Sequence, residues 1–340
     1  MKLVAGTLLK RPSFRSRTRR PDIKGPSSFL TGGRRDMQTE FLERCPSCLS
    51  PDHREVGTDG ICGLRRCSRC TLLFVSPRPT QAETEQIYSQ EYFQGSSKYG
   101  NPTGYQQNAS GYLARAHLMV EWLRSKTRLQ GGRWLDVGCG PGYLVEAASQ
   151  AGFDAIGVDV SIDAVEAGIS RGLHLVHGTG EELLQLVEPG FQVLTMFDTL
   201  FHLREPRNVL TAAKSLLVPG GVLVAGPFDL DIGGNTPAVG PAQYDFQAMG
   251  VPEHLSFVNQ RSMTVVLQEL GFEKLRFEPM VQSPGAVVSQ HAGFLPAWLV
   301  ALVRSFLRRL PWLQRWLHRV AARRVNRQAG YVLAWATNSV

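Results

Sequence analysis

The sequence has 340 residues, of which 43% are hydrophobic and 19% are charged, a composition typical of a globular protein that can bury a core. Its length favours one α/β domain with attachments. The longest apolar run, residues 295–303, contains Pro296 and is far shorter than the roughly 20 residues that a membrane-spanning helix needs. These features exclude a membrane-spanning protein.

The net charge of +8 is distributed unevenly along the chain. Residues 1–36 and residues 282–340 each carry an excess of eight positive charges, whereas residues 37–281 carry an excess of eight negative charges. An acidic middle argues against a nucleic-acid groove in the central part of the chain, and we find no firm nucleic-acid signal there. We expect basic tails or surfaces at the two ends.

Residues 1–36 are rich in Arg, Ser, Gly and Pro and show little apolar periodicity. We therefore expect a basic disordered tail. Two alternatives stay open for this tail: translation starts at Met37, or the segment is an organellar transit peptide. It lacks the compact apolar stretch of a secretory signal, and a cytoplasmic protein is the default expectation.

Four of the six cysteines form two C-x-x-C pairs, Cys45 with Cys48 and Cys67 with Cys70, separated by 18 residues. This spacing is typical of a four-thiolate zinc site. Four thiolates complete a tetrahedron and leave no position for water, so we expect a structural Zn²⁺ ion in a zinc ribbon over residues 37–79. Cys62 is expected to be a packing residue.

After the cysteines, residues 80–130 are predicted to be a helical connector. From residue 131 to 340, short apolar runs alternate with amphipathic segments. Strands are expected at 133–139, 154–160, 173–178, 191–198, 221–228 and 329–336, and residues 263–280 are expected to form a helix and a strand. The alternation predicts a parallel sheet with helices on both faces. A helical Arg-rich insertion is expected at about 282–328.

The most specific motif is Asp136-Val137-Gly138-Cys139-Gly140-Pro141-Gly142, between an expected strand and an expected helix. Glycines here let the backbone turn sharply and approach a ligand. Asp159 ends the next strand, about 20 residues further on, where an acid can meet ribose hydroxyls. Tyr143 replaces the third glycine of a dinucleotide fingerprint, and no G-K-[ST] follows, which excludes a P-loop.

This G-x-G-x-G loop resembles motif I of class I S-adenosylmethionine-dependent methyltransferases. Residues 191–221 resemble the fourth strand, loop and helix of the group that includes ubiquinone and glycan-pathway O-methyltransferases, with Asp198, His202 and Pro206 at its characteristic positions. Residues 254–257 match the H-L-x-F segment of that group. In glycan and natural-product relatives, similar cysteine knuckles and a stretch like Phe74 to Thr80 precede the methyltransferase domain. The resemblance implies a Rossmann-like, doubly wound, seven-stranded sheet.

The resemblance also implies the cofactor, S-adenosyl-L-methionine. We expect the following residues to bind it: Asp136, Gly138, Cys139, Gly140, Gly142, Asp159, Val160, Glu181 and Phe197. Thr179 to Glu181 replace the Asp-Ala pair that many relatives have near the adenine. Phe201 stands where some relatives have a second Glu, which argues against a magnesium site built from Asp198 and His202.

A sulfonium methyl group is already activated, so the enzyme must align a nucleophile and, for a hydroxyl group, remove its proton. Imidazole suits that step at neutral pH. His202, expected at the end of the fourth strand where such sheets bind ligands, is the first candidate for the catalytic base, and His254 is the second. The alternative for each is a histidine that only bonds the backbone or shapes the pocket.

The basic segment around Trp312 and Trp316 places Trp and Leu at helical spacing among arginines. Three interpretations stay open for it: a helix at the surface of an anionic membrane, which would make the protein peripheral there, a lid on the domain, or a basic surface that faces RNA. We expect methyl transfer to a small, lipid-linked or saccharide-linked acceptor, with oxygen as the acceptor atom. The alternatives are an RNA methyltransferase and a non-catalytic cofactor-binding scaffold. The oligomeric state stays open.

Overall fold

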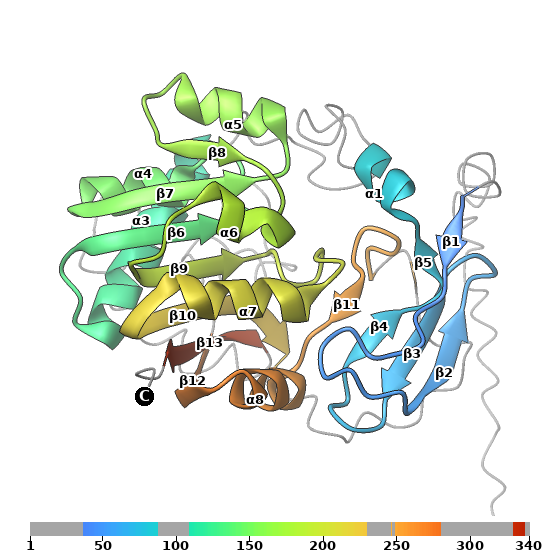
Figure 1. The fold of residues 1–340 in the computed structure, drawn as a ribbon. Helices are drawn as coiled ribbons and strands as arrows, with labels where there is room; N and C mark the ends of the chain where they lie inside the picture. The colour runs from blue at the N-terminus through green and yellow to red at the C-terminus, as the bar shows by residue number, and fades with distance from the viewer. Residues whose placement is uncertain (1–36, 88–108, 230–245, 247–248, 280–328, 337–340) are drawn as a thin grey trace, which may run out of the picture. The chain divides into compact units, whose positions relative to one another are not determined.

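The computed structural model describes residues 37–87, 109–229, 246, 249–279 and 329–336 (Figure 1). The predicted basic tail and the predicted Arg-rich insertion, with its three open interpretations, lie outside the described residues. No helix within the described ranges combines the length and the apolar character needed to cross a bilayer.

Short antiparallel strands form an N-terminal module around the four paired cysteines. Its strands are β1 (Thr39–Glu40), β2 (His53–Thr58), β3 (Gly63–Cys67), β4 (Leu73–Val75) and β5 (Arg78–Pro79), followed by helix α1 (Gln81–Ile87). β2, β3 and β4 form one sheet, and β1 pairs with β5. β11 (Ser256–Phe257), from far along the chain, adds a fourth strand beside β4, with Ser256 opposite Phe74. The module is therefore joined to the rest of the protein by a shared sheet.

A seven-stranded sheet forms the core of the second part. It contains β6 (Gly132–Val137), β7 (Phe153–Asp159), β8 (Leu175–His177), β9 (Phe191–Phe197), β10 (Leu217–Asp229), β12 (Phe272–Pro279) and β13 (Ala329–Ala336). Their order is β12-β13-β10-β9-β6-β7-β8. β6 to β10 are parallel to their neighbours in this set, as predicted, and the seven strands confirm the Rossmann-like sheet.

The last strand departs from the predicted parallel arrangement. β13 lies between β10 and β12 and is antiparallel to both. Antiparallel pairing satisfies the backbone groups of β10 and β12 as well as parallel pairing would. Residues Tyr331 to Ala334 are completely buried, so this reversed strand belongs to the core.

Helices cover both faces of the sheet. They are α3 (Ala109–Thr127), α4 (Tyr143–Gln150), α5 (Ile162–Ile169), α6 (Leu183–Leu186), α7 (Pro206–Leu216) and α8 (Gln260–Glu269), with a 3₁₀ turn, η1, at Gly180–Glu182. One apolar core includes residues of α7 and α8, and the other includes residues of α3 and α4. Helix α5 begins after Ser161, whose side chain accepts a hydrogen bond from the backbone nitrogen of Ala164.

Candidate functional site

The glycine loop turns sharply at the end of β6. Gly138, Gly140 and Gly142 have φ angles of +75°, +52° and +81°, in the region that favours glycine. A Cβ atom added to Gly138 would lie 2.4 Å from the Thr199 hydroxyl oxygen, so there is no room for a side chain. The loop therefore brings bare backbone to the carboxyl edge of the sheet, and α4 begins directly after it.

Asp159, at the end of β7, holds this loop in place. One carboxylate oxygen accepts a hydrogen bond from the backbone nitrogen of Gly140 at 2.7 Å, and the other accepts one from the backbone nitrogen of Ser161 at 2.9 Å. Burial raises the pKa of Asp159, and these two hydrogen bonds oppose the rise. Each carboxylate oxygen can accept a second hydrogen bond, for example from a ligand hydroxyl.

A cavity of about 440 Å³ lies beside the loop, within the size range of small-molecule sites. Its lining comes from five places in the chain: the glycine loop, the start of α5 with the residues before it, the segment 177–182, the loop after β9 and helix α1. The residues that line it include Gly138, Gly140, Asp159, Val160, Glu181, Asp198, Thr199, His202, Arg204, Gln81, Thr84 and Glu85. The cavity is therefore at the carboxyl ends of the parallel strands, where sheets of this kind bind ligands.

The predicted cofactor residues divide into two sets. Gly138, Gly140, Asp159, Val160 and Glu181 line the cavity. The remaining four are not among the lining residues: Asp136, Cys139, Gly142 and Phe197.

Asp136 is 4% exposed, accepts a hydrogen bond from the Thr195 hydroxyl at 2.6 Å, and has its pKa raised by burial to about 7. Burial also raises the pKa of the Cys139 thiol. Phe197 contacts Tyr331 edge to face, with 5.1 Å between ring centroids.

The structure brings the two candidate histidines together. The ring centroids of His202 and His254 are 4.9 Å apart. Nδ1 of His202 lies 3.3 Å from the backbone oxygen of Glu253, and Nδ1 of His254 lies 2.8 Å from the backbone oxygen of Met249. A carbonyl only accepts, so each Nδ1 donates, which leaves the lone pair of each neutral ring on Nε2.

Burial, reinforced by the neighbouring His254, lowers the pKa of His202 to about 3. His202 is therefore neutral throughout the physiological range. Only His202 of the two histidines lines the cavity.

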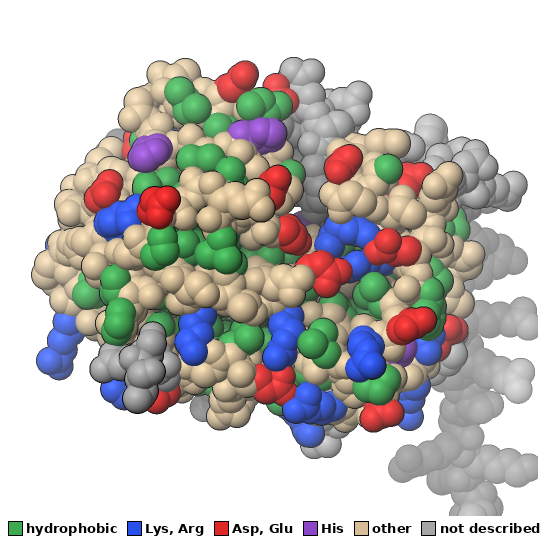
Figure 2. Space-filling view, in the orientation of Figure 1, with side chains coloured by type: hydrophobic (Ala, Val, Ile, Leu, Met, Phe, Trp, Pro, Cys, Tyr) green, Lys and Arg blue, Asp and Glu red, His purple; other side chains and the backbone are tan. Residues whose placement is uncertain are grey.

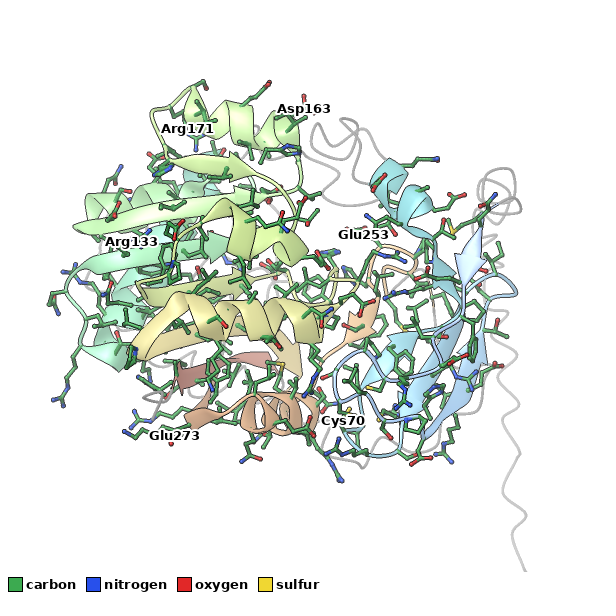
Figure 3. The ribbon with its side chains drawn as sticks, in the orientation of Figure 1. Cys70, Arg133, Asp163, Arg171, Glu253 and Glu273 are labelled. Carbon is green, nitrogen blue, oxygen red and sulfur yellow. The ribbon has the colours of Figure 1, made fainter. Side chains whose placement is uncertain are left out.

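The Glu253 side chain was not predicted. It is 8% exposed, and one of its carboxylate oxygens lies within 4.8 Å of a ring nitrogen of both His202 and His254 (Figure 3). It directly precedes His254 in the sequence, but that adjacency alone does not reveal the contact with His202, 51 residues away. The three side chains form one polar group beside the cavity.

The four paired cysteines lie together inside the N-terminal module. The sulfur atoms of Cys45 and Cys70 are 3.6 Å apart, those of Cys48 and Cys67 are 3.5 Å apart, and all four lie within 4.8 Å of one another. Zinc–sulfur bonds of about 2.3 Å in a tetrahedron put sulfur atoms roughly 3.8 Å apart, so this donor set fits Zn²⁺. Cys62 packs in a different cluster, with Leu64 and Val75.

Comparisons with known proteins agree with this arrangement. Residues 105–276, half of the chain, match the family model described as a methyltransferase domain. The ubiquinone biosynthesis O-methyltransferase of Methylococcus capsulatus is 26% identical over 202 residues, which cover 55% of this chain and 84% of the relative. The protein of the same name from Ralstonia nicotianae is 27% identical over 178 residues, which cover 49% of this chain and 74% of the relative. A solved S-adenosylmethionine-dependent methyltransferase from Archaeoglobus fulgidus aligns with 65% of this chain and 94% of its own, with a TM-score of 0.42 and 17% identity.

Proposed function

We propose a specific activity for this chain, which belongs to the methyltransferase-domain family and is a class I S-adenosylmethionine-dependent methyltransferase. The proposed activity is methylation of a hydroxyl oxygen of a small, lipid-linked or saccharide-linked acceptor. One observation carries this proposal: the neutral ring of His202 lines the same cavity as the glycine loop and Asp159. A hydroxyl acceptor needs such a proton acceptor beside the methyl donor.

The glycine loop and Asp159 are the proposed cofactor site. Bound S-adenosylmethionine supplies a methyl group on a sulfonium, which needs no further activation. Gly138 and Gly140 let the backbone approach the amino-acid part of this ligand, and the free lone pairs of Asp159 accept hydrogen bonds from the ribose hydroxyls. Val160 and Glu181 also line the cavity and are the proposed contacts of the adenine.

His202 is the proposed proton acceptor. When the acceptor hydroxyl is methylated, its proton would pass to Nε2 of His202. An imidazole with so low a pKa does not retain that proton, so His254 and Glu253 beside it would take it on. The Glu253 carboxylate also stabilises a positive charge on either ring.

The four-cysteine cluster is the proposed site of one structural Zn²⁺ ion. Its sulfur atoms have the separations that a tetrahedral four-thiolate site requires, and all four cysteines are buried. Four protein ligands leave no open position, so the ion takes no part in methyl transfer. Its role is to hold the knuckles of the N-terminal module together.

Transfer of label from S-adenosylmethionine tests the acceptor class. The purified protein is incubated with labelled cofactor and, separately, with lipid, saccharide and RNA fractions. Label in the lipid or saccharide fraction, lost when ether bonds are cleaved, is the expected result. Label in the RNA fraction alone supports the RNA methyltransferase alternative and overturns the proposed acceptor.

A further inference from the structure

Two arginines from distant parts of the chain each donate a hydrogen bond to the backbone of the segment that contains the other. Arg78, in β5 of the N-terminal module, donates from Nη1 to the backbone oxygen of Arg204 at 2.6 Å. Arg204, in the loop after β9, donates from Nη1 to the backbone oxygen of Pro79 at 2.8 Å. The contact is reciprocal and spans about 125 residues of sequence. We call these two residues the arginine clamp.

Two carboxylates balance the charges of the clamp. Glu40 accepts from Nε of Arg78 at 2.8 Å and also binds Nη2 of Arg204. Glu205 accepts from Nη2 of Arg78 at 3.0 Å. Arg78 is only 4% exposed, and a buried guanidinium is tolerated because its donors are paired in this way. On the face drawn in Figure 2, basic side chains flanked by acidic ones lie between the N-terminal module and the sheet domain.

The clamp is connected to both sides of the cavity. Arg204 lines the cavity and also donates to the Thr84 hydroxyl at 2.7 Å, on helix α1. Thr84 lines the same cavity, as do Gln81 and Glu85 of that helix. On the other side, the backbone nitrogen of Glu205 donates to the Glu181 carboxylate, a residue of the proposed adenine side.

We infer that Arg78 is a positioning residue for the cofactor site: it fixes Arg204 and α1 on the cavity wall, so that the N-terminal module supplies part of the binding surface for the nucleoside of S-adenosylmethionine. This inference rests on the proposed cofactor site. The nucleoside is favoured over the acceptor because α1 shares the cavity with Asp159 and with Glu181, to which the clamp is connected through Glu205. A module that served only to keep the protein folded would leave cofactor affinity unchanged in any variant that stays folded.

The test measures binding of S-adenosylhomocysteine to the full-length protein by calorimetry, together with zinc content and thermal unfolding. Arg78→Met is expected to weaken binding about tenfold or more at a temperature where it is fully folded, and Arg78→Lys to recover only part of the loss, because an ammonium group cannot reproduce the fork. Arg54→Met, an exposed arginine of β2 in the same module, is the matched control and should bind as wild type does.

Thr84→Val provides a second variant that keeps the side-chain shape and removes only the hydroxyl bonded by Arg204. It is expected to weaken binding in the same direction, and the double variant Arg78→Met/Thr84→Val should lose less than the two single losses combined. Wild-type affinity in Arg78→Met, or loss of affinity there only together with zinc and folding while Thr84→Val binds normally, overturns the inference. If the wild-type protein does not bind S-adenosylhomocysteine, the proposed cofactor site itself is wrong, which is a different outcome.

Discussion

The rings of His202 and His254 meet edge to face, with centroids 4.9 Å apart, and the ring of Phe201 lies 4.5 Å from both. This packing removes water from His202 and is the main cause of its low pKa. Both histidines keep a fixed orientation because each Nδ1 is bonded to a backbone carbonyl. A neutral, oriented imidazole at the cavity wall is suited to accept a proton without first losing one.

The first prediction concerns proton transfer. His202→Asn should lower the rate of methyl transfer about a hundredfold or more, because the acceptor hydroxyl then lacks a base at the cavity wall. Glu253→Gln should lower it less, since it removes only the charge beside the rings. Affinity for S-adenosylhomocysteine should change little in either variant. Turnover is measured with the labelled cofactor, and the exposed His174→Asn is the control. Undiminished turnover in His202→Asn would rule out this residue as the base.

The second prediction concerns the glycine loop and compares two glycines with left-handed backbone. Gly138→Ala should weaken binding of S-adenosylhomocysteine strongly, because its Cβ would lie 2.4 Å from the Thr199 hydroxyl oxygen at the cavity wall. Gly172→Ala imposes a similar backbone strain, at a φ of +82°, but has open space around it, and should bind normally. Asp159→Ala should also bind poorly, since the ribose contacts are lost. Equal affinities in all three variants would contradict the cofactor site.

The third prediction concerns the metal. Protein purified under reducing conditions without chelator should contain about one zinc ion per chain, as one four-thiolate site requires. Cys48→Ser should lose that zinc and unfold at a lower temperature, because one of the four sulfur ligands is gone. Cys62→Ser is the matched control: this cysteine is also buried in the module but packs in a separate cluster, so zinc should be retained. Elemental analysis that finds no zinc in the wild-type protein would defeat the assignment.

The parts of this molecule that the sequence predicts are those whose structure depends on residues close together in the chain. The strand, glycine turn and helix from Gly132 to Gln150 follow one another within one short segment, and their order is visible in the apolar pattern and the glycines. The cysteine spacing likewise indicated the cluster of four sulfurs. In contrast, β13 inserts antiparallel between two strands, and no local pattern specifies the direction of a neighbour in a sheet.

The features that sequence could not predict depend on contacts between distant residues. Helix α1 lines the cavity beside Arg204, where Arg78 binds the backbone oxygen of Arg204 and Arg204 binds that of Pro79, and neither arginine at its position indicates the other. The role of Glu253 could not be predicted for the same reason. Its sequence neighbour His254 was a candidate, but the proximity of Glu253 to His202 arises from the fold. Local patterns therefore predicted the glycine loop, whereas the opposite wall of the cavity could be identified only from the three-dimensional structure.

The last prediction concerns stability and pH. The pKa of His202 is about 3 in the folded protein, against 6.5 for an ordinary histidine, so between these values the unfolded chain binds a proton at this site that the folded protein does not. The contribution of His202 to stability therefore falls as the pH is lowered from about 6.5 toward 3 and is fully present only above that window, whereas buried Asp136, whose pKa is raised to about 7, contributes in the opposite direction. We therefore expect a fall in pH from 7.5 to 5 to be less destabilising for a variant without this imidazole than for the wild-type protein.

His202→Asn is that variant, because asparagine does not titrate. The comparison uses the difference between the two pH values within each protein, since removal of the ring also leaves a cavity that lowers stability at every pH. His174→Asn, which removes an exposed histidine, should retain the wild-type pH dependence. If the pH dependence of His202→Asn equals that of the wild-type protein, then the pKa of His202 is not lowered in the folded protein.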